Sequence, residues 1–410
     1  MANVWTIRLA NSVYTAMRQL SLPDNPSDFA FPTLRGASVS IHTSFAESEA
    51  IWRSAVSGGA STVFQTFEWL STWHDVVGRA AGVQPRIVVV ADRGGTPLLL
   101  LPLAICREPC GRSLQFLGGH STDYNAPVVD PRFAAEAGPD DVRRLWASVL
   151  DRLAAVDLVR LERMPLTVDS LPNPLAGLPG LHHAHDAYAA TLPSTFAAFA
   201  KARSAQFFSQ NRRKRRKLEA LGPVEMVAPD SGAERAELVR FLLEHKSRWQ
   251  VASGLANTFG QAEQRALYER LTQTPFAEGG IHVAGLKVGG AWVAALWGTV
   301  FRGQYAMILT TYREDWSQHS VGRLLMESVI QDCIARGDLS LFDLTIGGEG
   351  YKAHWADRSD PLYDLVAARS LRGRLFLASR RVLKRCRQAM ARAPGPASAA
   401  RRPSEPESRS

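Results

Sequence analysis

Residues 281–312, IHVAGLKVGGAWVAALWGTVFRGQYAMILTTY, precede the turn HSVGRL (319–324), and LFDLTIGGEGYKAHW follows at 341–355. Their apolar and β-branched runs predict strands at 281–287, 290–300, 304–312 and 341–346, with a helix at 321–336. A tight turn between a strand and a helix, with Gly322 in place of a bulky residue, can offer backbone N–H groups to a phosphate. The region therefore predicts an enzyme that holds a pyrophosphate-bearing donor.

The chain has 410 residues, of which 46% are hydrophobic, so it can bury a large core in two or three globular domains. No run approaches the roughly 18 uninterrupted apolar residues of a membrane span, and the N-terminus lacks the features of a secretory signal. We therefore expect a cytoplasmic protein. The four cysteines are scattered without a metal-ligand spacing, so neither a disulfide framework nor a bound metal is expected.

The net charge of +9 is concentrated at the C-terminus. Residues 371–410 contain 11 basic and two acidic residues, an excess that equals the charge of the whole chain, so residues 1–370 are neutral overall. The periodicity of 371–392 predicts a basic amphipathic helix, which either lies on anionic lipid or docks on the protein core. The proline-rich residues 393–410 are expected to form a disordered tail.

The rest of the chain shows the same order of elements twice. In the first half we expect helices at 47–56, 66–73 and 140–154, and strands at 86–91, 98–105, 114–117, 126–129 and 158–163. In the second half we expect helices at 195–221, 233–250 and 261–272 before the strands of the opening stretch, and a last strand at 362–368 that closes the sheet. The chain is thus divided into a weakly ordered leader (1–38), two α/β domains with mixed sheets (39–190 and 191–370), the helix 371–392 and the tail 393–410.

Several short motifs in this order resemble those of a known superfamily. They are Phe64–Leu70, Leu117–Gly119 with Asp123 and Tyr124, Arg212–Lys214, Gly322, Phe342 with Asp343, and Gly348–Lys352. With them, roughly residues 40–370 resemble the GNAT acyltransferases, and within these the tandem-domain CelD/BcsL or BioF2-like acetyltransferases, which are related to the FemAB aminoacyltransferases. The resemblance implies an α/β fold of two GNAT-like domains, with the donor site in the second.

The donor turn departs from the usual GNAT pattern, in which a second small residue lets the pyrophosphate approach the helix. Leu324 stands at that position. The resemblance implies acetyl-CoA or another acyl-CoA as donor, and the FemAB relatives make aminoacyl-tRNA the alternative. The residues expected to bind the donor are Ile308, Leu309, His319, Ser320, Val321, Gly322 and Arg323. An ordinary helix start capped by Ser320 is the other interpretation of the turn.

Acyl transfer needs a base for the nucleophile, a hydrogen-bond donor for the oxyanion and an acid for the leaving group. Glu349, Tyr351 and Lys352 are the candidates for catalysis, because similar enzymes often place a tyrosine acid beside this strand. A glycine-rich loop with a packed tyrosine is the alternative interpretation. The residues expected to contact the substrate are His120, Asp123, Tyr124, Trp249 and Asp343.

Two other polar clusters carry weaker signals. The six cations of 212–217 follow two phenylalanines and form either a solvated helix face or a tRNA-binding surface. His182, His183 and His185 lie in a segment that we interpret as a linker, and we do not expect them to bind a metal.

These observations predict an acyltransferase that moves an acyl group, most simply acetyl, onto an amine or hydroxyl of a small-molecule or carbohydrate acceptor. Direct attack is expected, since no Cys or Ser lies in a nucleophile motif. The family name suggests exopolysaccharide or cell-envelope biosynthesis, with peripheral contact at the inner face of the membrane. The alternatives are an aminoacyl-tRNA-dependent transferase and an inactive GNAT scaffold that binds an envelope-synthesis partner. The acceptor and the oligomeric state stay open.

Overall fold

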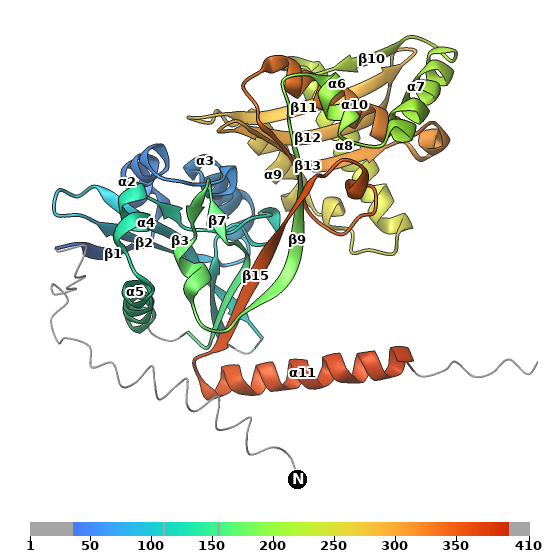
Figure 1. Ribbon diagram of the computed structural model, residues 1–410. Coiled ribbons are helices and arrows are strands. Elements are labelled where there is room, and N and C mark those ends of the chain that lie inside the picture. Colours follow the sequence, from blue (N-terminus) through green and yellow to red (C-terminus); the bar gives the residue numbers. More distant parts are fainter. Residues whose placement is uncertain (1–35, 110, 154–155, 393–410) are drawn as a thin grey trace, which may run out of the picture.

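The computed structural model describes residues 36–109, 111–153 and 156–392, so most of the expected leader and the whole expected tail lie outside the described residues. One mixed sheet of 13 strands runs through the molecule, and helices cover it in two lobes (Figure 1). The expected fold class, α/β with mixed sheets, is confirmed.

In the first half of the chain, most of the observed helices and strands correspond to predicted ones. It consists of β1 (Ser38–His42), α2 (Phe45–Gly58), α3 (Phe67–Trp73), β2 (Gln84–Ala91), β3 (Pro97–Glu108), β4 (Gly111–Phe116), β5 (Val128–Val129), α4 (Pro131–Glu136), α5 (Pro139–Arg152), β6 (Leu158–Pro165), β7 (Thr167–Val168), β8 (Leu171–Pro172) and β9 (Leu181–Thr191). Strand β9 was missed, because its three histidines were assigned to a linker. The pairing of β9 with neighbours on both sides gives these polar residues a place in the sheet.

The second half repeats this order of elements. It consists of α6 (Phe196–Lys201), α7 (Ala205–Glu219), β10 (Val224–Val227), α8 (Gly232–Ala252), α9 (Ala262–Gln273), β11 (Gly280–Val288), β12 (Ala291–Phe301), β13 (Gln304–Tyr312), α10 (Val321–Arg336), β14 (Leu341–Ile346), β15 (Arg358–Ala368) and α11 (Leu371–Arg392). The single helix expected at 195–221 is wrong. Two helices occur instead, because Ser204 is extended and its side chain caps the start of α7.

The duplication is visible in the strand pairing. In the first half, β4 and β6 are parallel neighbours joined through α5, and they pair over three residues from Ser113 to Gln115. In the second half, β13 and β14 are parallel neighbours joined through α10, and they pair over three residues from Gln304 to Ala306. The hairpins β2–β3 and β11–β12 also correspond. The two halves are therefore copies of one α/β unit.

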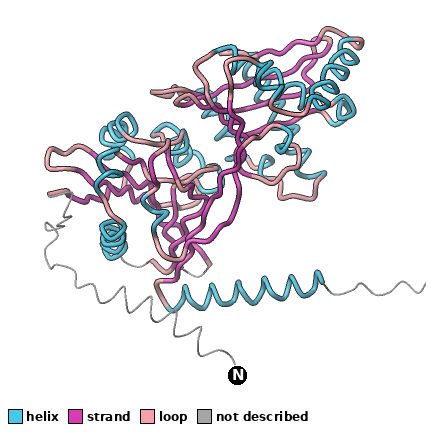
Figure 2. Tube along the Cα trace, in the orientation of Figure 1, coloured by secondary structure: helices cyan, strands magenta, loops and turns pink. Residues whose placement is uncertain are grey.

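The two units exchange their last strands. The sheet order is β1-β2-β3-β4-β6-β15-β9-β14-β13-β12-β11-β10, so β15 lies beside β6 of the first half and β9 lies beside β14 of the second. The long strands β9 and β15 cross between the lobes side by side (Figures 1 and 2). The expectation that 362–368 closes the sheet of the second half is thus wrong, while the domain bounds themselves stay a prediction.

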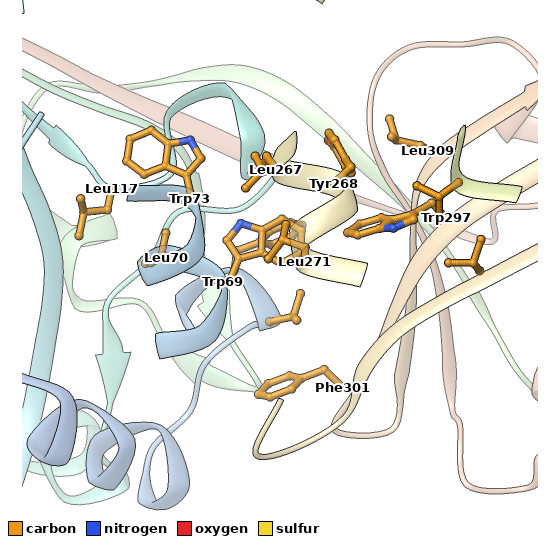
Figure 3. Close-up of a cluster of buried hydrophobic side chains, with 14 of the residues drawn as sticks. Trp69, Leu70, Trp73, Leu117, Leu267, Tyr268, Leu271, Trp297, Phe301 and Leu309 are labelled. Atoms are coloured by element: carbon orange, nitrogen blue, oxygen red, sulfur yellow. The ribbon is translucent and has the colours of Figure 1, made fainter. Parts of the chain in front are cut away.

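A shared hydrophobic core joins the two lobes. Helices α2 and α3 of the first half meet α8 and α9 of the second in one cluster of buried side chains (Figure 3). At its centre the rings of Trp69 and Trp297 are 5.9 Å apart, and Trp297 also contacts Tyr268 edge to face at 5.0 Å. Separate cores on the opposite faces pack α5 against the first-half strands and α10 against the second-half strands. The lobes are therefore joined through apolar packing as well as through the sheet.

Polar contacts reinforce this junction. The buried carboxylate of Glu68 accepts a hydrogen bond from the backbone N–H of Ala277 at 3.2 Å. From the second half, Arg302 Nη1 donates to the carbonyl of Gly59 at 2.7 Å, at the C-terminal end of α2. Among the residues that the structure describes, no helix combines the length and apolar content needed to cross a membrane.

Replacing Trp297 by alanine should destabilise both lobes together. The ring is fully buried, and its loss leaves a cavity that costs about 3–5 kcal/mol of unfolding free energy. Because strands are exchanged, we expect one cooperative urea transition, shifted to lower urea, by both tryptophan fluorescence and circular dichroism. Trp249→Ala is the matched control, since its ring is 42% exposed. Two resolved transitions in the unsubstituted protein would contradict the coupling.

Candidate active site

The candidate site lies where the parallel strands β13 and β14 separate. They pair only from Gln304 to Ala306 and from Leu341 to Asp343. Beyond this point β13 stays with β12, while β14 continues along β9. The last paired residue of β14 is the buried Asp343, so the point of divergence carries a carboxyl group.

Asp343 is held by groups from both halves of the chain. The Tyr124 hydroxyl, which belongs to the first half, donates to Asp343 Oδ1 at 2.8 Å. The backbone N–H of Thr345 donates to the same oxygen at 2.7 Å. Thr345 has a φ of 59°, a conformation that is strained for a β-branched residue. Two predicted substrate residues are thus brought together, in a geometry that the backbone maintains under strain.

The motif Phe64–Leu70 supports Tyr124 rather than contacting Asp343. Gln65 Nε2 donates to the Tyr124 carbonyl at 2.8 Å, and the ring of Phe64 packs edge to face on the tyrosine at 5.7 Å. The indole N–H of Trp52 donates to the Gln65 carbonyl at 2.8 Å. The first half therefore positions a hydroxyl in the site of the second. This role of Gln65 was missed, because a sequence motif does not say what it touches.

The surroundings shift the pKa values of this pair upward. Burial, helped by the nearby charge of Asp123, raises the pKa of Asp343 to about 7, although the hydrogen bonds from Tyr124 and Thr345 oppose the shift. Burial and the adjacent Asp343 carboxylate raise the pKa of Tyr124 well above its usual value. At neutral pH, Tyr124 is consequently a hydrogen-bond donor, and Asp343 can take up or release a proton.

Asp123, the neighbour of Tyr124 in the chain, lies half-buried in the same region. Burial raises the pKa of its carboxyl group, and the Arg163 guanidinium, 4.0 Å away, opposes the rise. Arg163 also donates to the Thr122 carbonyl at 2.6 Å, which fixes the loop that carries Asp123 and Tyr124. Arg163 was missed, since nothing in the sequence distinguishes it from other strand arginines. His120 lies at the exposed start of this loop, and its carbonyl also accepts from Arg163.

The three residues predicted for catalysis lie in different surroundings. Lys352 is buried, and its ammonium group donates to the Ile346 carbonyl at 2.6 Å and contacts Glu349 Oε2 at 3.0 Å. It also donates to the Thr345 carbonyl at 3.3 Å, so its three protons are engaged and it closes the loop after β14. Tyr351 is 38% exposed, and its hydroxyl has no hydrogen-bond partner among the described residues. Their catalytic roles stay predictions.

Lys246 is a residue of this region that was missed. Its ammonium group donates to the Thr310 carbonyl on β13 at 3.3 Å and lies 4.4 Å from the ring centre of Trp249. Burial lowers the pKa of Lys246, and the Lys352 charge lowers it further, while Glu349 opposes them. The i, i+3 spacing of Lys246 and the predicted Trp249 places both on one face of α8, which is the signal that could have found it.

The residues predicted to hold the donor on β13 lie at an irregularity of the strand. Trp297 of β12 pairs with Leu309 and the next residue pairs with Met307, so Ile308 is an extra residue, as in a β-bulge. A bulge leaves backbone groups outside the regular ladder. Ile308 and Leu309 could therefore offer backbone hydrogen bonds close to the point where β14 diverges.

The predicted turn before α10 exposes backbone donors. Ser320 has a φ of 56°, and its side chain accepts from Lys214 at 2.8 Å instead of capping the helix. Within the described part of the chain, the N–H groups of Val321 and Gly322 have no acceptor. A Cβ atom on Gly322 would lie 3.2 Å from the Tyr312 ring, so a larger side chain would crowd the turn. His319, also predicted here, ends the short helix that precedes Ser320.

Cationic groups flank this turn. The Nε and Nη2 atoms of Arg323 are buried without a hydrogen-bond partner among the described residues, and the guanidinium lies 4.8 Å from the Phe207 ring. Leu324, which departs from the usual pattern, is fully buried in the core of the second half. It therefore does not cover the turn. Unpaired N–H groups, a helix N-terminus and an unpaired guanidinium together fit a phosphate-bearing donor.

The basic run of 212–217 is divided between two environments. Lys214 and Arg215 face α10, where they bind Ser320 and Ser328 at 2.8 Å each. The exposed members are Arg212, Arg213, Arg216 and Lys217. No group of three or more potential metal ligands occurs among the described residues, His182, His183 and His185 included.

Comparison with known proteins gives a domain family for part of the chain and similar folds for most of it. Residues 205–353 match the family of acetyltransferase (GNAT) domains. The solved structure of FemX is similar in fold, with a TM-score of 0.55 at 10% identity, and the similarity covers 80% of this chain and 97% of FemX. None of the curated proteins matches the chain in sequence.

Two lysylphosphatidylglycerol synthetase structures are more distantly similar. One is the C-terminal domain of a putative enzyme from Agrobacterium fabrum, with 15% identity, a TM-score of 0.49, and coverage of 83% of this chain and 98% of that one. The other is L-PGS from Bacillus licheniformis, with 11% identity, a TM-score of 0.49, and coverage of 82% and 96%. The domain match and the likeness to FemX, and not these two structures, show a tandem GNAT-like fold in which residues 205–353 form a GNAT-type acyltransferase domain.

Proposed function

We propose that the protein transfers an acyl group from an acyl-CoA, most simply acetyl-CoA, to an amine or hydroxyl of a small-molecule or carbohydrate acceptor. The observation that carries this proposal is the buried Asp343–Tyr124 pair at the point where β13 and β14 diverge. It places a proton acceptor with a pKa of about 7 next to a bulged strand that can hold a carbonyl group.

Different residues would serve as the base, the orienting group and the acid in acyl transfer. The bound donor supplies a thioester carbonyl that is open to attack. The Asp343 carboxylate takes the proton of the attacking amine or hydroxyl, and the Tyr124 hydrogen bond keeps the carboxylate oriented. The fixed charge of Lys352 favours the ionised form of Asp343. A protonated tyrosine hydroxyl, on Tyr351 or Tyr124, is the acid available to the leaving group.

The donor turn supplies binding rather than chemistry. The pyrophosphate would be held by the N–H groups of Val321 and Gly322 and by the guanidinium of Arg323. Lys214 would fix the turn through its hydrogen bond to Ser320. Exposed Trp249 and the cation of Lys246 would border the acceptor. The proposal names the acceptor by its chemical class alone. It includes a role in envelope biosynthesis, which the family resemblance suggests, only in general terms.

Direct attack is preferred to a covalent enzyme intermediate. Two cysteines have described side chains, and burial raises the pKa of Cys106 to about 11 and that of Cys333 to about 12. Both are therefore protonated at neutral pH and are poor nucleophiles.

Gly322→Glu should abolish acyl-CoA binding. The new side chain would crowd the Tyr312 ring and place a negative charge at the phosphate site. We expect calorimetry with acetyl-CoA to show at least about tenfold weaker binding, which corresponds to about 1.4 kcal/mol. Gly322→Ala is the control, because the partly exposed Tyr312 can yield to a methyl group. Equal affinity of the glutamate variant would refute the donor site, and an unsubstituted protein that binds neither acetyl-CoA nor charged tRNA would favour the scaffold alternative.

Asp343→Asn should remove both the base and a pH-dependent term in stability. We expect kcat/KM of the unsubstituted enzyme to rise with pH up to about 7, where Asp343 loses its proton, and the variant to lose at least about 100-fold. Because the folded-state pKa is raised, the contribution of Asp343 to stability is present below pH 4 and is lost as the pH rises through 7. As the pH rises from 4 to 7, the free energy of unfolding of the variant should therefore increase relative to that of the unsubstituted protein.

Asp332→Asn is the matched control for this experiment. Asp332 is an exposed carboxylate on α10 in the same half of the chain. Its replacement should leave the activity and the pH dependence of stability unchanged. If both aspartate variants follow the same stability curve between pH 4 and 8, Asp343 does not titrate as proposed.

Aminoacyl-tRNA is the second candidate donor, favoured by the four exposed cations of α7. Replacing Arg212, Arg213, Arg216 and Lys217 by glutamine should then reduce the slope of log K against log salt by about 3, since each contact with a phosphate contributes about 0.7–0.9. Filter binding of charged tRNA measures this slope. Glutamine at Arg372, Arg374 and Arg380 of α11 is the control. Absence of salt-dependent tRNA binding would leave acyl-CoA as the donor.

A further inference from the structure

The C-terminal helix α11 projects from the base of β15, away from both lobes (Figures 1 and 2). It has 22 residues, so it is about 33 Å long. The sheet, the shared core and the candidate site are complete without it. Its sequence nevertheless has a strong pattern of apolar and basic residues that the proposed function does not use.

The root of α11 is fixed to the first half of the chain. The Asp157 carbonyl accepts the backbone N–H of Arg369 at 2.8 Å, and its carboxylate accepts the Ser370 hydroxyl. Gly373 packs so tightly that a Cβ atom there would lie 2.2 Å from the Asp157 carbonyl oxygen. The side of the helix that carries Gly373 therefore faces the protein, and its rotation about the helix axis is set.

The opposite side of the helix is apolar and unpartnered. Leu371, Leu375, Ala378 and Val382 recur at intervals of three or four residues and form one stripe. At 100° per residue this stripe lies about 180° from Gly373. Leu371 is 71% exposed, Leu375 is 63% exposed and Val382 is 59% exposed, so the body of the protein does not cover them.

The charges around this stripe have one sign. The helix sequence contains eight basic residues and no acidic residue, whereas residues 1–370 are neutral overall. Arg372 and Arg374 are exposed, and at 100° per residue they flank the stripe on its two sides. An occupant of this face must therefore present both an apolar layer and negative charge.

We propose that α11 lies on an anionic lipid surface, with the stripe of Leu371, Leu375, Ala378 and Val382 in the acyl boundary and the arginines at the phosphates. A lipid interface satisfies both parts of the pattern. A second copy of α11 would cover the apolar stripe but would bring two sets of eight cations together. A nucleic acid would pair with the arginines but would leave the stripe in water. The fixed root then holds the catalytic lobes at a set orientation to the membrane.

Flotation of the full chain with vesicles tests this proposal. We expect binding to vesicles of equal parts phosphatidylcholine and phosphatidylglycerol and none to phosphatidylcholine alone. Arg372→Gln and Arg374→Gln together should weaken partitioning about 25-fold, since each cation near an anionic surface contributes roughly a factor of five. Leu371→Ser, Leu375→Ser and Val382→Ser together keep every charge and should weaken it at least about tenfold.

The control carries the same loss of charge elsewhere: glutamine at Arg212 and Arg213 of α7. It should partition like the unsubstituted protein, and thermal denaturation should show that every variant is folded. Equal binding of the serine variant, or an equal loss in the α7 control, would overturn the proposal. So would an unsubstituted protein that ignores the vesicles, whether it instead binds RNA through α11 or dimerises, in sedimentation, through the leucine stripe.

Discussion

The exchange of β9 and β15 between the two units is the constraint on which the rest of the structure depends. The strand beside β6 of the first half is β15, from the second half, and the strand beside β14 of the second half is β9, from the first. The lobes therefore cannot move apart without breaking the sheet. Domains joined only by a linker are expected to move relative to each other. Here Tyr124 of one unit stays 2.8 Å from Asp343 of the other, a precision that acid–base chemistry requires.

The two copies have diverged at equivalent positions. The third residue pair of β4 and β6 places Arg160 where the second unit has Asp343. Arg160 forms ion pairs with Glu108 at 2.6 Å and Glu162 at 2.8 Å, so the first unit closes this position with opposite charges. The second unit leaves a carboxyl group with a raised pKa instead. The first unit thus has a paired cation at this position, and the second has the carboxyl group that we propose as the base.

The element order and the turn before α10 could be predicted from the sequence, because helices and strands leave local periodic patterns. The strand exchange could not, since the polar residues 181–191 did not stand out as a strand, and the strand expected at 362–368 carries no local sign of which distant strands it pairs with. Asp343, Asp123 and Tyr124 were found through a resemblance, and the structure joins them. Lys246, Arg163 and Gln65 were missed because their significance lies in which residues they touch.

The position of β15 also bears on how the chain is made. A ribosome releases the first unit long before Arg358 emerges. Until then the edge of β6 that faces β15 has no neighbour, and β9 lacks β15 even after β14 has emerged. Contacts between segments so far apart slow folding, and unpaired edges invite association with other chains. The nascent first unit therefore keeps an open sheet edge until β15, the last described strand, has been synthesised.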